Sequence, residues 1–107
     1  MTDHKGYELV EIARKSGKIK KGTNEVTKFL ERGQAKAVVY AADVNPKEIV
    51  MHLPLLAKDK GILCIEVPSK EELGAAAGLT KPTAAIAIID AGDAKNLLKE
   101  WENGRRQ

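Results

Sequence analysis

Apolar residues recur along the chain in two different patterns. In some stretches they fall three or four positions apart, the spacing of one buried helix face, as with Val26, Phe29 and Leu30. Between these stretches lie short runs in which almost every residue is apolar, such as AKAVVYAA at 35–42, typical of strands covered on both faces. The alternation predicts helices that pack on a small buried sheet.

Residues suited to helix ends bound the helical stretches of the first half. A helix is predicted over about residues 3–15, with Gly17 placed to stop it. After a turn at Gly22, the Thr23 hydroxyl is expected to cap a second helix, which ends at Gly33.

The second half predicts two helices with clear start signals. Asn45 is followed by a proline at the first helical position, and Pro54 is expected to interrupt or redirect this helix near its middle. Ser69 and Glu72 have the spacing of a capping box and begin a helix that closes at Gly78.

Strands and a terminal helix complete the predicted fold. The strands are expected at 18–21, 35–42, 62–67 and 83–90. Asp93 is expected to cap a last helix, whose apolar positions are Leu97, Leu98 and Trp101. The fold class is therefore α/β, a three-layer α/β/α sandwich with a four-stranded mixed sheet. Residues 1–107 form a single domain, with a short frayed tail at 103–107.

Composition agrees with one compact domain and excludes several classes of protein. The chain has 107 residues, 43% of them hydrophobic, which is enough for one core. The single Cys64 cannot form an internal disulfide, and two histidines far apart offer no metal-ligand spacing. No apolar stretch has the length of a signal peptide or a membrane span. A cytoplasmic protein without a metal or cofactor is expected.

Positive charge is concentrated at one end of the chain. Eighteen Lys and Arg against fifteen Asp and Glu give a formal net charge of only +3. Residues 1–40 contain nine bases and five acids, whereas the remainder contains nine bases and ten acids. A polyanion is therefore expected to approach the first part of the chain.

The sequence offers no recognisable catalytic partner for any residue that could act in catalysis. No glycine loop of the Walker or dinucleotide-binding type is present. Cys64 lies in an apolar strand, where a structural thiol is expected. Asp43 follows a buried strand and His52 lies on a helix, so a small enzyme using either would need a pocket near the end of the second strand. The sequence favours a protein that is not an enzyme, with this alternative left open.

A basic segment precedes the second helix. Lysine or arginine occupies five of the eight positions from 14 to 21, and no acid lies among them. The unpaired N–H groups and the dipole of a helix N-terminus also favour an anion. Two features that attract phosphate therefore coincide, against the simpler interpretation of a solvated basic loop.

The first turn of that helix carries side chains that can read base edges. Asn24 and Lys28 share a face because they lie four positions apart, and Glu25 flanks them. The amide donates and accepts, the carboxylate accepts and the ammonium donates, so the three could contact guanine edges exposed by non-Watson–Crick pairing. An acid weakens phosphate binding, which points to base reading by Glu25, although acids also favour helix N-termini.

Several motifs occur in order between Lys18 and Leu79: KGTNEVTK, ADVNP, HLPLL, and VPSK with LG and AG after it. In this order they resemble the archaeal ribosomal L7Ae family, within the wider L7Ae/L30e group of kink-turn RNA binders. The resemblance implies the same α/β/α sandwich. It also implies as ligand an RNA kink-turn, in which tandem sheared G·A pairs beside a short bulge bend two stems sharply.

The resemblance implies a first RNA contact at the start of the second helix. Asn24, Glu25 and Lys28 would contact the guanines of the G·A pairs. Gly22 and Thr23 would let the RNA approach the backbone. The protein would thereby stabilise a bent RNA that is otherwise sparsely populated.

The resemblance implies a second contact further along the chain. An apolar loop at Ile65, Glu66 and Val67 would cover a flipped-out bulge nucleotide, although the end of a buried strand is an equal interpretation of Ile65. Lys21 and Lys70 would contact phosphates by their charge and position.

The resemblance finally implies partners. Family members serve in the large ribosomal subunit, in box C/D and box H/ACA guide RNPs and in archaeal RNase P, where other subunits do the chemistry. The expected partners are kink-turn RNA, as rRNA, guide RNA or RNase P RNA, and protein subunits of guide RNPs, with no membrane and a monomer when free. The alternative is a protein-interaction or assembly module of the same fold without the RNA site, favoured if Leu97 and Trp101 are unburied.

Overall fold

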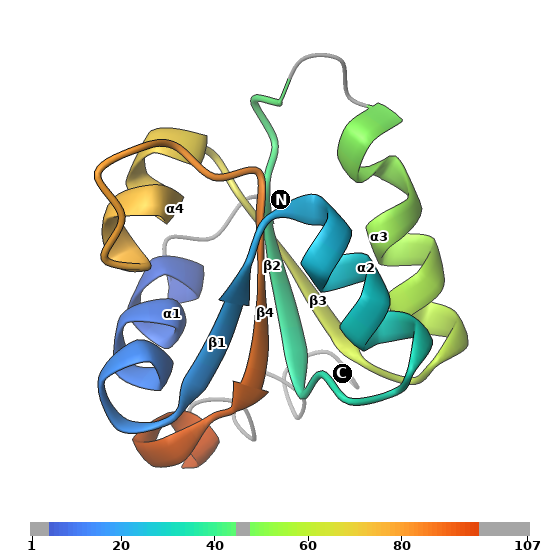
Figure 1. Cartoon of the computed structure of the whole chain (residues 1–107), viewed down its shortest axis with the longest axis horizontal. Helices are drawn as coiled ribbons and strands as arrows, with labels where there is room; N and C mark the ends of the chain where they lie inside the picture. Colours follow the sequence, from blue (N-terminus) through green and yellow to red (C-terminus); the bar gives the residue numbers. More distant parts are fainter. Residues whose placement is uncertain (1–4, 45–47, 97–107) are drawn as a thin grey trace.

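Four short strands form one mixed sheet at the centre of the molecule. The computed structural model describes residues 5–44 and 48–96. Strands β1 (Lys18–Lys21), β2 (Ala37–Ala41), β3 (Leu63–Val67) and β4 (Ala85–Asp90) lie in the order β1-β4-β2-β3. β2 pairs parallel with β3, whereas β4 pairs antiparallel with both β1 and β2. Consequently β1, β2 and β3 run in the same direction and end at one edge of the sheet (Figure 1).

Helices cover both faces of this sheet. On one face lie α1 (Lys5–Ser16) and α4 (Lys70–Ala76), and on the other α2 (Thr23–Glu31) and α3 (Glu48–Asp59) (Figure 1). A short 3₁₀ turn, η1 (Gly92–Ala94), follows β4 and packs against the end of α1. The arrangement confirms the predicted α/β/α sandwich with a four-stranded mixed sheet. None of the described helices is long and apolar enough to cross a membrane.

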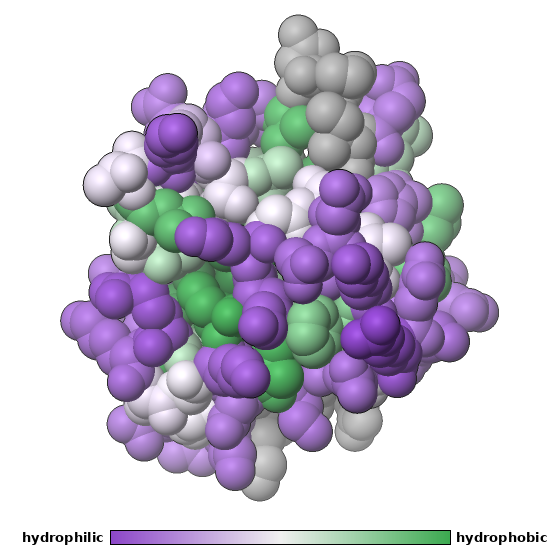
Figure 2. All heavy atoms as spheres, viewed as in Figure 1, coloured by the Kyte–Doolittle hydropathy of each residue, from purple (hydrophilic) through white to green (hydrophobic). Residues whose placement is uncertain are grey.

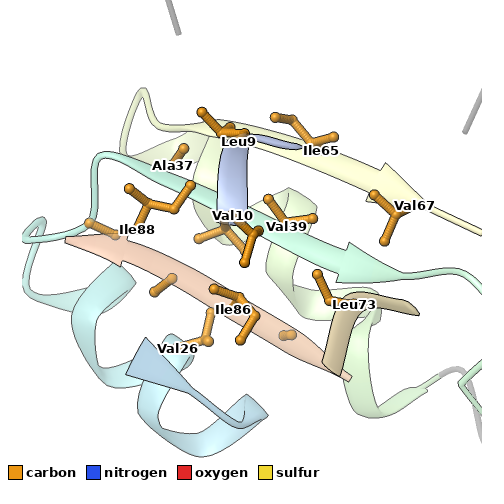
Figure 3. Close-up of a cluster of buried hydrophobic side chains, with 14 of the residues drawn as sticks. Leu9, Val10, Val26, Ala37, Val39, Ile65, Val67, Leu73, Ile86 and Ile88 are labelled. Atoms are coloured by element: carbon orange, nitrogen blue, oxygen red, sulfur yellow. The ribbon is translucent and has the colours of Figure 1, made fainter. Parts of the chain in front are cut away.

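The core between these layers is almost entirely aliphatic. Leu9 and Val10 of α1 and Leu73 of α4 are fully buried over the face of the sheet that carries Val39 and Ile65 (Figure 3). Full burial of one such side chain contributes about 1.5–3 kcal/mol relative to exposure. The apolar runs and helical stripes of the sequence therefore account for the layers.

The start of α2 differs from the prediction. The N-cap is Gly22, not Thr23, and no side chain caps the helix. The backbone of Gly22 has φ 91° and ψ 141°, a conformation that glycine adopts at little cost, so the chain turns at this residue. Thr23 is thus already helical, and its carbonyl accepts a hydrogen bond of 2.8 Å from the hydroxyl of Thr27.

Helix α3 also differs from the prediction, because it is not interrupted at Pro54. It continues without interruption from Glu48 to Asp59 with Pro54 inside it. Proline removes one backbone donor from the helix. Val50, Leu53 and Ala57 on either side are nonetheless buried. Their packing on the sheet offsets the lost hydrogen bond, and the expected break does not occur.

The predicted N-cap of α4, Ser69, is confirmed, but the capping box is not completed. The Ser69 hydroxyl accepts a hydrogen bond of 3.2 Å from the Glu72 N–H. The Ser69 N–H, however, donates to the Tyr7 hydroxyl oxygen at 2.8 Å rather than completing a capping box. The start of α4 is thereby tied to α1.

Asp93, the predicted cap of the last helix, lies within the 3₁₀ turn that follows β4. The N-cap of η1 is Ala91, and the Gly92 N–H donates to the Asp90 carboxylate at 3.0 Å. Asp93 lies inside the turn, where its N–H donates to the Ser16 hydroxyl at 2.9 Å. The other residues on which predictions were made, namely Asn45, Pro46, Leu97, Leu98, Trp101 and the tail at 103–107, lie outside the described residues.

Tyr40 makes the stability of the fold depend on pH in the alkaline range. Its hydroxyl donates to Glu66 Oε2 at 3.2 Å, and burial, together with the negative charge of Glu66, raises the pKa of Tyr40 from 10.0 to about 12. Since the pKa is raised in the folded state, the stability that this group contributes is complete below pH 10 and is lost as pH rises through about 12. We expect Tyr40→Phe to reduce the loss of stability between these values, measured by urea denaturation at several pH values. Equally steep losses in both proteins would contradict this expectation.

Candidate nucleic-acid interface

The first turn of α2 lies at the edge of the sheet where β1, β2 and β3 end. β1 ends at Lys21, Gly22 turns the chain, and the helix begins at the next residue. The Gly22 N–H donates to the Ala85 carbonyl at 3.1 Å, which ties this turn to the start of β4. The sheet therefore fixes the position of the helix N-terminus.

The three predicted base-reading side chains are brought together there. Asn24, Glu25 and Lys28 are all exposed. Lys28 Nζ lies 3.9 Å from Glu25 Oε1, with 61% and 50% of the two side chains exposed. An ion pair in so much solvent contributes little to stability. Neither charge is therefore required by the fold, and both remain available to a ligand.

Two surface hollows lie on either side of this turn. The hollow toward α3 is lined by Thr23, Asn24, Thr27, Lys28, Glu48 and His52. The hollow toward α4 is lined by Arg14, Ile19, Lys20, Lys21, Glu25, Ala77 and Leu79. Asn24 and Lys28 thus border one hollow and Glu25 the other. A ligand that contacts all three side chains must cross the N-terminus of α2.

The hollow toward α4 combines cations with apolar surface. Arg14 Nε donates to the Ala76 carbonyl at 3.3 Å, which holds the guanidinium group beside the end of α4. Lys20 Nζ lies 5.8 Å from the ring centroid of Phe29, within cation–π distance. The hydrophilic side chains on this side of the molecule surround apolar surface (Figure 2). A nucleotide, with its anionic phosphate and apolar base faces, matches this combination.

Leu79 is one of the residues in this hollow that are not among the predicted contacts. The chain after α4 leads into β4, and β4 pairs with β1, so Leu79 comes close to the start of α2. The available signal was an apolar residue directly after the helix-ending Gly78, whose φ is 77°. Arg14 belongs to the predicted basic segment but is not among the predicted contacts.

The predicted apolar loop at 65–67 is corrected by the structure. These residues are the end of β3, with Ile65 only 3% and Val67 0% exposed. Both side chains pack beneath α1, where a Cβ on Gly6 would lie 2.5 Å from Val67 Cγ1 and 3.2 Å from Ile65 Cγ2 (Figure 3). Glu66 lies on the opposite face of the sheet, half-buried beside Tyr40. The side chains of Ile65 and Val67 are therefore core residues in this conformation.

Lys21 and Lys70 lie at the same edge of the sheet, near the ends of two different strands. Lys21 ends β1 and is exposed, and Lys70 begins α4 just after β3. Two strands separate β1 from β3, which corresponds to about 14 Å between them. The Lys70 N–H donates to Asp43 Oδ1 at 2.8 Å, which fixes the backbone there. The two lysines can therefore contact different phosphates of one ligand.

The groups considered for catalysis have structural partners. Asp43 accepts the Lys70 N–H, and His52 Nε2 lies 2.8 Å from Thr27 Oγ1. A hollow does exist near the end of β2, but neither Asp43 nor His52 lines it. Within residues 5–44 and 48–96, no group of three His, Cys, Asp or Glu side chains is placed to hold a metal ion.

Fold and surface together define a small α/β/α binding domain, whose chemistry is concentrated at an exposed helix N-terminus between two hollows. Residues 4–98 match the family described as Ribosomal protein L7Ae/L30e/S12e/Gadd45. The chain belongs to this family. The resemblance predicted from residues 18–79 is therefore confirmed.

Two relatives illustrate the match. The chain is 56% identical over 93 residues to large ribosomal subunit protein eL8 of Methanobrevibacter smithii, which covers 87% of this chain and 76% of the relative. It is similar in structure to a solved 15.5kD RNA binding protein of Giardia lamblia, with a TM-score of 0.80 and 34% identity over 94% of this chain and 86% of that chain. Membership of this ribosomal protein family places the chain among proteins that are not enzymes.

Proposed function

We propose that this protein binds RNA kink-turns and stabilises their bent form as a protein of the large ribosomal subunit. The observation that carries the proposal is the exposed group of Asn24, Glu25 and Lys28 at the N-terminus of α2, bordered by a hollow on each side. An acid in a basic surface weakens phosphate binding but can accept hydrogen bonds from guanine N1–H and N2–H₂. The site is thus better suited to base edges than to phosphates alone.

Affinity and discrimination come from different residues in this proposal. Lys21, Lys70 and Arg14 neutralise phosphates, which supplies affinity that does not depend on sequence. Asn24, Glu25 and Lys28 contact the guanines of tandem sheared G·A pairs. Because the bent RNA is the form that offers these edges, binding shifts the RNA toward it.

The turn before the helix permits close approach of the RNA backbone. A Cβ added at Gly22 would have nothing within 4 Å, so the space beside this glycine is open toward solvent. The turn leads directly into the helix, whose N-terminal N–H groups from Thr23 onward receive no hydrogen bond from an N-cap side chain. In this proposal the flipped-out bulge nucleotide lies in the hollow toward α4, against Ile19, Ala77 and Leu79.

The proposal extends to the particles in which such an RNA occurs. A ribosomal relative and an RNA-binding structural neighbour support rRNA as one ligand. We propose further roles as a core component of box C/D and box H/ACA guide RNPs and of RNase P, in the cytoplasm, where other subunits supply catalysis. Crosslinking of the protein in cells, followed by sequencing of the attached RNA, tests this assignment.

Binding to paired RNAs tests the proposed function directly. A kink-turn RNA and a control whose tandem G·A pairs are replaced by Watson–Crick pairs are titrated at fixed salt. We expect the control to bind at least a hundredfold more weakly, since each good base contact contributes about 1–3 kcal/mol. Equal affinity for the two RNAs would contradict base reading. Absence of binding to either RNA would select the alternative, an assembly module without an RNA site.

A further inference from the structure

We infer that His52 is a positioning residue for the RNA site, a role that rests on the proposed function. His52 lies on α3, and its Nε2 is 2.8 Å from the Oγ1 of Thr27 on α2. Both side chains are partly buried. This hydrogen bond therefore joins α2 to α3 within one helical turn of the proposed base-reading side chains.

The direction of this hydrogen bond follows from the hydroxyl. Thr27 Oγ1 also donates its hydrogen to the carbonyl of Thr23 at 2.8 Å. A hydroxyl has one hydrogen, so the bond between Thr27 and His52 needs the hydrogen on His52 Nε2. The result is a directed chain from His52 through Thr27 to Thr23, in which each hydrogen bond polarises the next.

This chain holds a helix end whose N-cap residue supplies no side-chain hydrogen bond. The N-cap of α2 is a glycine, and no side chain caps the first turn. Uncapped first turns leave up to four N–H groups without helical partners, which favours fraying. The hydrogen bonds from His52 and Thr27 tie this turn to α3, which itself packs on the sheet.

The turn of α2 that these hydrogen bonds hold is the turn that carries the proposed RNA site. Asn24 directly follows Thr23, Lys28 directly follows Thr27, and all four line the hollow that His52 closes from the α3 side. A loosened turn would have to be ordered again when RNA binds, and that ordering reduces affinity. His52 therefore raises specific affinity without supplying a base contact of its own.

Thr27→Val provides the sharpest test because it removes the hydroxyl and leaves the shape and His52 unchanged. We expect about tenfold weaker binding of the kink-turn RNA and unchanged binding of the Watson–Crick control. Thr27→Ser, which retains the hydroxyl, is expected to bind within about twofold of the parent protein. His52→Gln keeps an N–H donor of similar reach and should bind more tightly than His52→Leu, which has none.

A double variant separates positioning from direct contact. If His52 acts through Thr27, Thr27→Val combined with His52→Leu should bind no more than about twofold more weakly than the weaker single variant. If His52 itself contacted RNA, the two losses would multiply, and the positioning role would be overturned. Thermal unfolding of each variant shows whether the fold is retained.

Hydrogen exchange of the unbound protein tests the same link without RNA. We expect Thr27→Val to speed exchange of the amides of residues 26–28, which donate the first backbone hydrogen bonds of α2, and to leave those of the central strands unchanged. Unchanged exchange in α2, with kink-turn affinity equal to that of the parent protein, would overturn the inference. Failure of the parent protein to distinguish the two RNAs would instead overturn the proposed function, whereas the exchange result would still decide whether His52 holds the turn.

Discussion

Glu25→Ala is expected to weaken binding of a kink-turn RNA by about 1–3 kcal/mol, although the variant carries one more net positive charge. In our proposal the carboxylate accepts hydrogen bonds from a guanine, and alanine leaves those donors unpaired. The carboxylate is half exposed, and its contact with Lys28 contributes little to folding. The loss should therefore appear in the dissociation constant, measured by titration at fixed salt, and not in the melting temperature.

Glu31 offers a matched control on the same helix. It is an exposed acid at the far end of α2, so Glu31→Ala removes the same charge away from the proposed site. We expect this variant to bind both the kink-turn RNA and its Watson–Crick control slightly more tightly, as electrostatics alone predicts. Tighter binding by Glu25→Ala as well would show that Glu25 reads no base.

Gly74→Ala is expected to destabilise the protein by about 1–3 kcal/mol, the range found for overpacked sites. A Cβ on Gly74 would overlap the carbonyl oxygen of Lys81 and lie 3.1 Å from the Cα of Pro82. Both obstacles are backbone atoms, so the strain cannot be relieved by a change of rotamer. Urea denaturation measures the effect, and the chain segment that carries Leu79 should move away from α4.

The sign of the stability change in Gly74→Ala distinguishes overpacking from helix propensity. Helix propensity alone would make Gly74→Ala stabilising by about 1 kcal/mol. The exposed neighbour Ala75 calibrates the helix, because Ala75→Gly should lose about that amount through propensity only. A stabilised Gly74→Ala protein would mean that α4 and the following segment are not in close contact.

The layers of this fold were predictable because their signals are local. Strands β2, β3 and β4 are short, mainly apolar runs, and each helix has an apolar stripe whose period can be counted. The errors arose where backbone conformation or packing outweighed side-chain preference. Gly22 turned the chain before Thr23 could cap α2. Burial of Leu53 and Ala57 held α3 together across Pro54.

The site was predictable only in its local part. Asn24, Glu25 and Lys28 lie within one turn, so helical spacing alone brings them together. The approach of Leu79 to Glu25 depends on β4 pairing with β1, which no short-range pattern shows. The burial of Ile65 depends on how closely α1 approaches at Gly6. Neither contact can be inferred from the spacing of residues in the sequence.

The place of β1 at the border of the sheet has a consequence for solubility. Among the described residues no strand lies on its outer side, and such a border invites pairing with another chain. β1 is only four residues long, three of them are lysines, and its register is irregular between Lys18 and Ile19. Shortness, lysine and irregular register each discourage intermolecular pairing. The lysines that attract RNA phosphates thus also keep unbound copies apart, so replacing them to weaken RNA binding should promote aggregation.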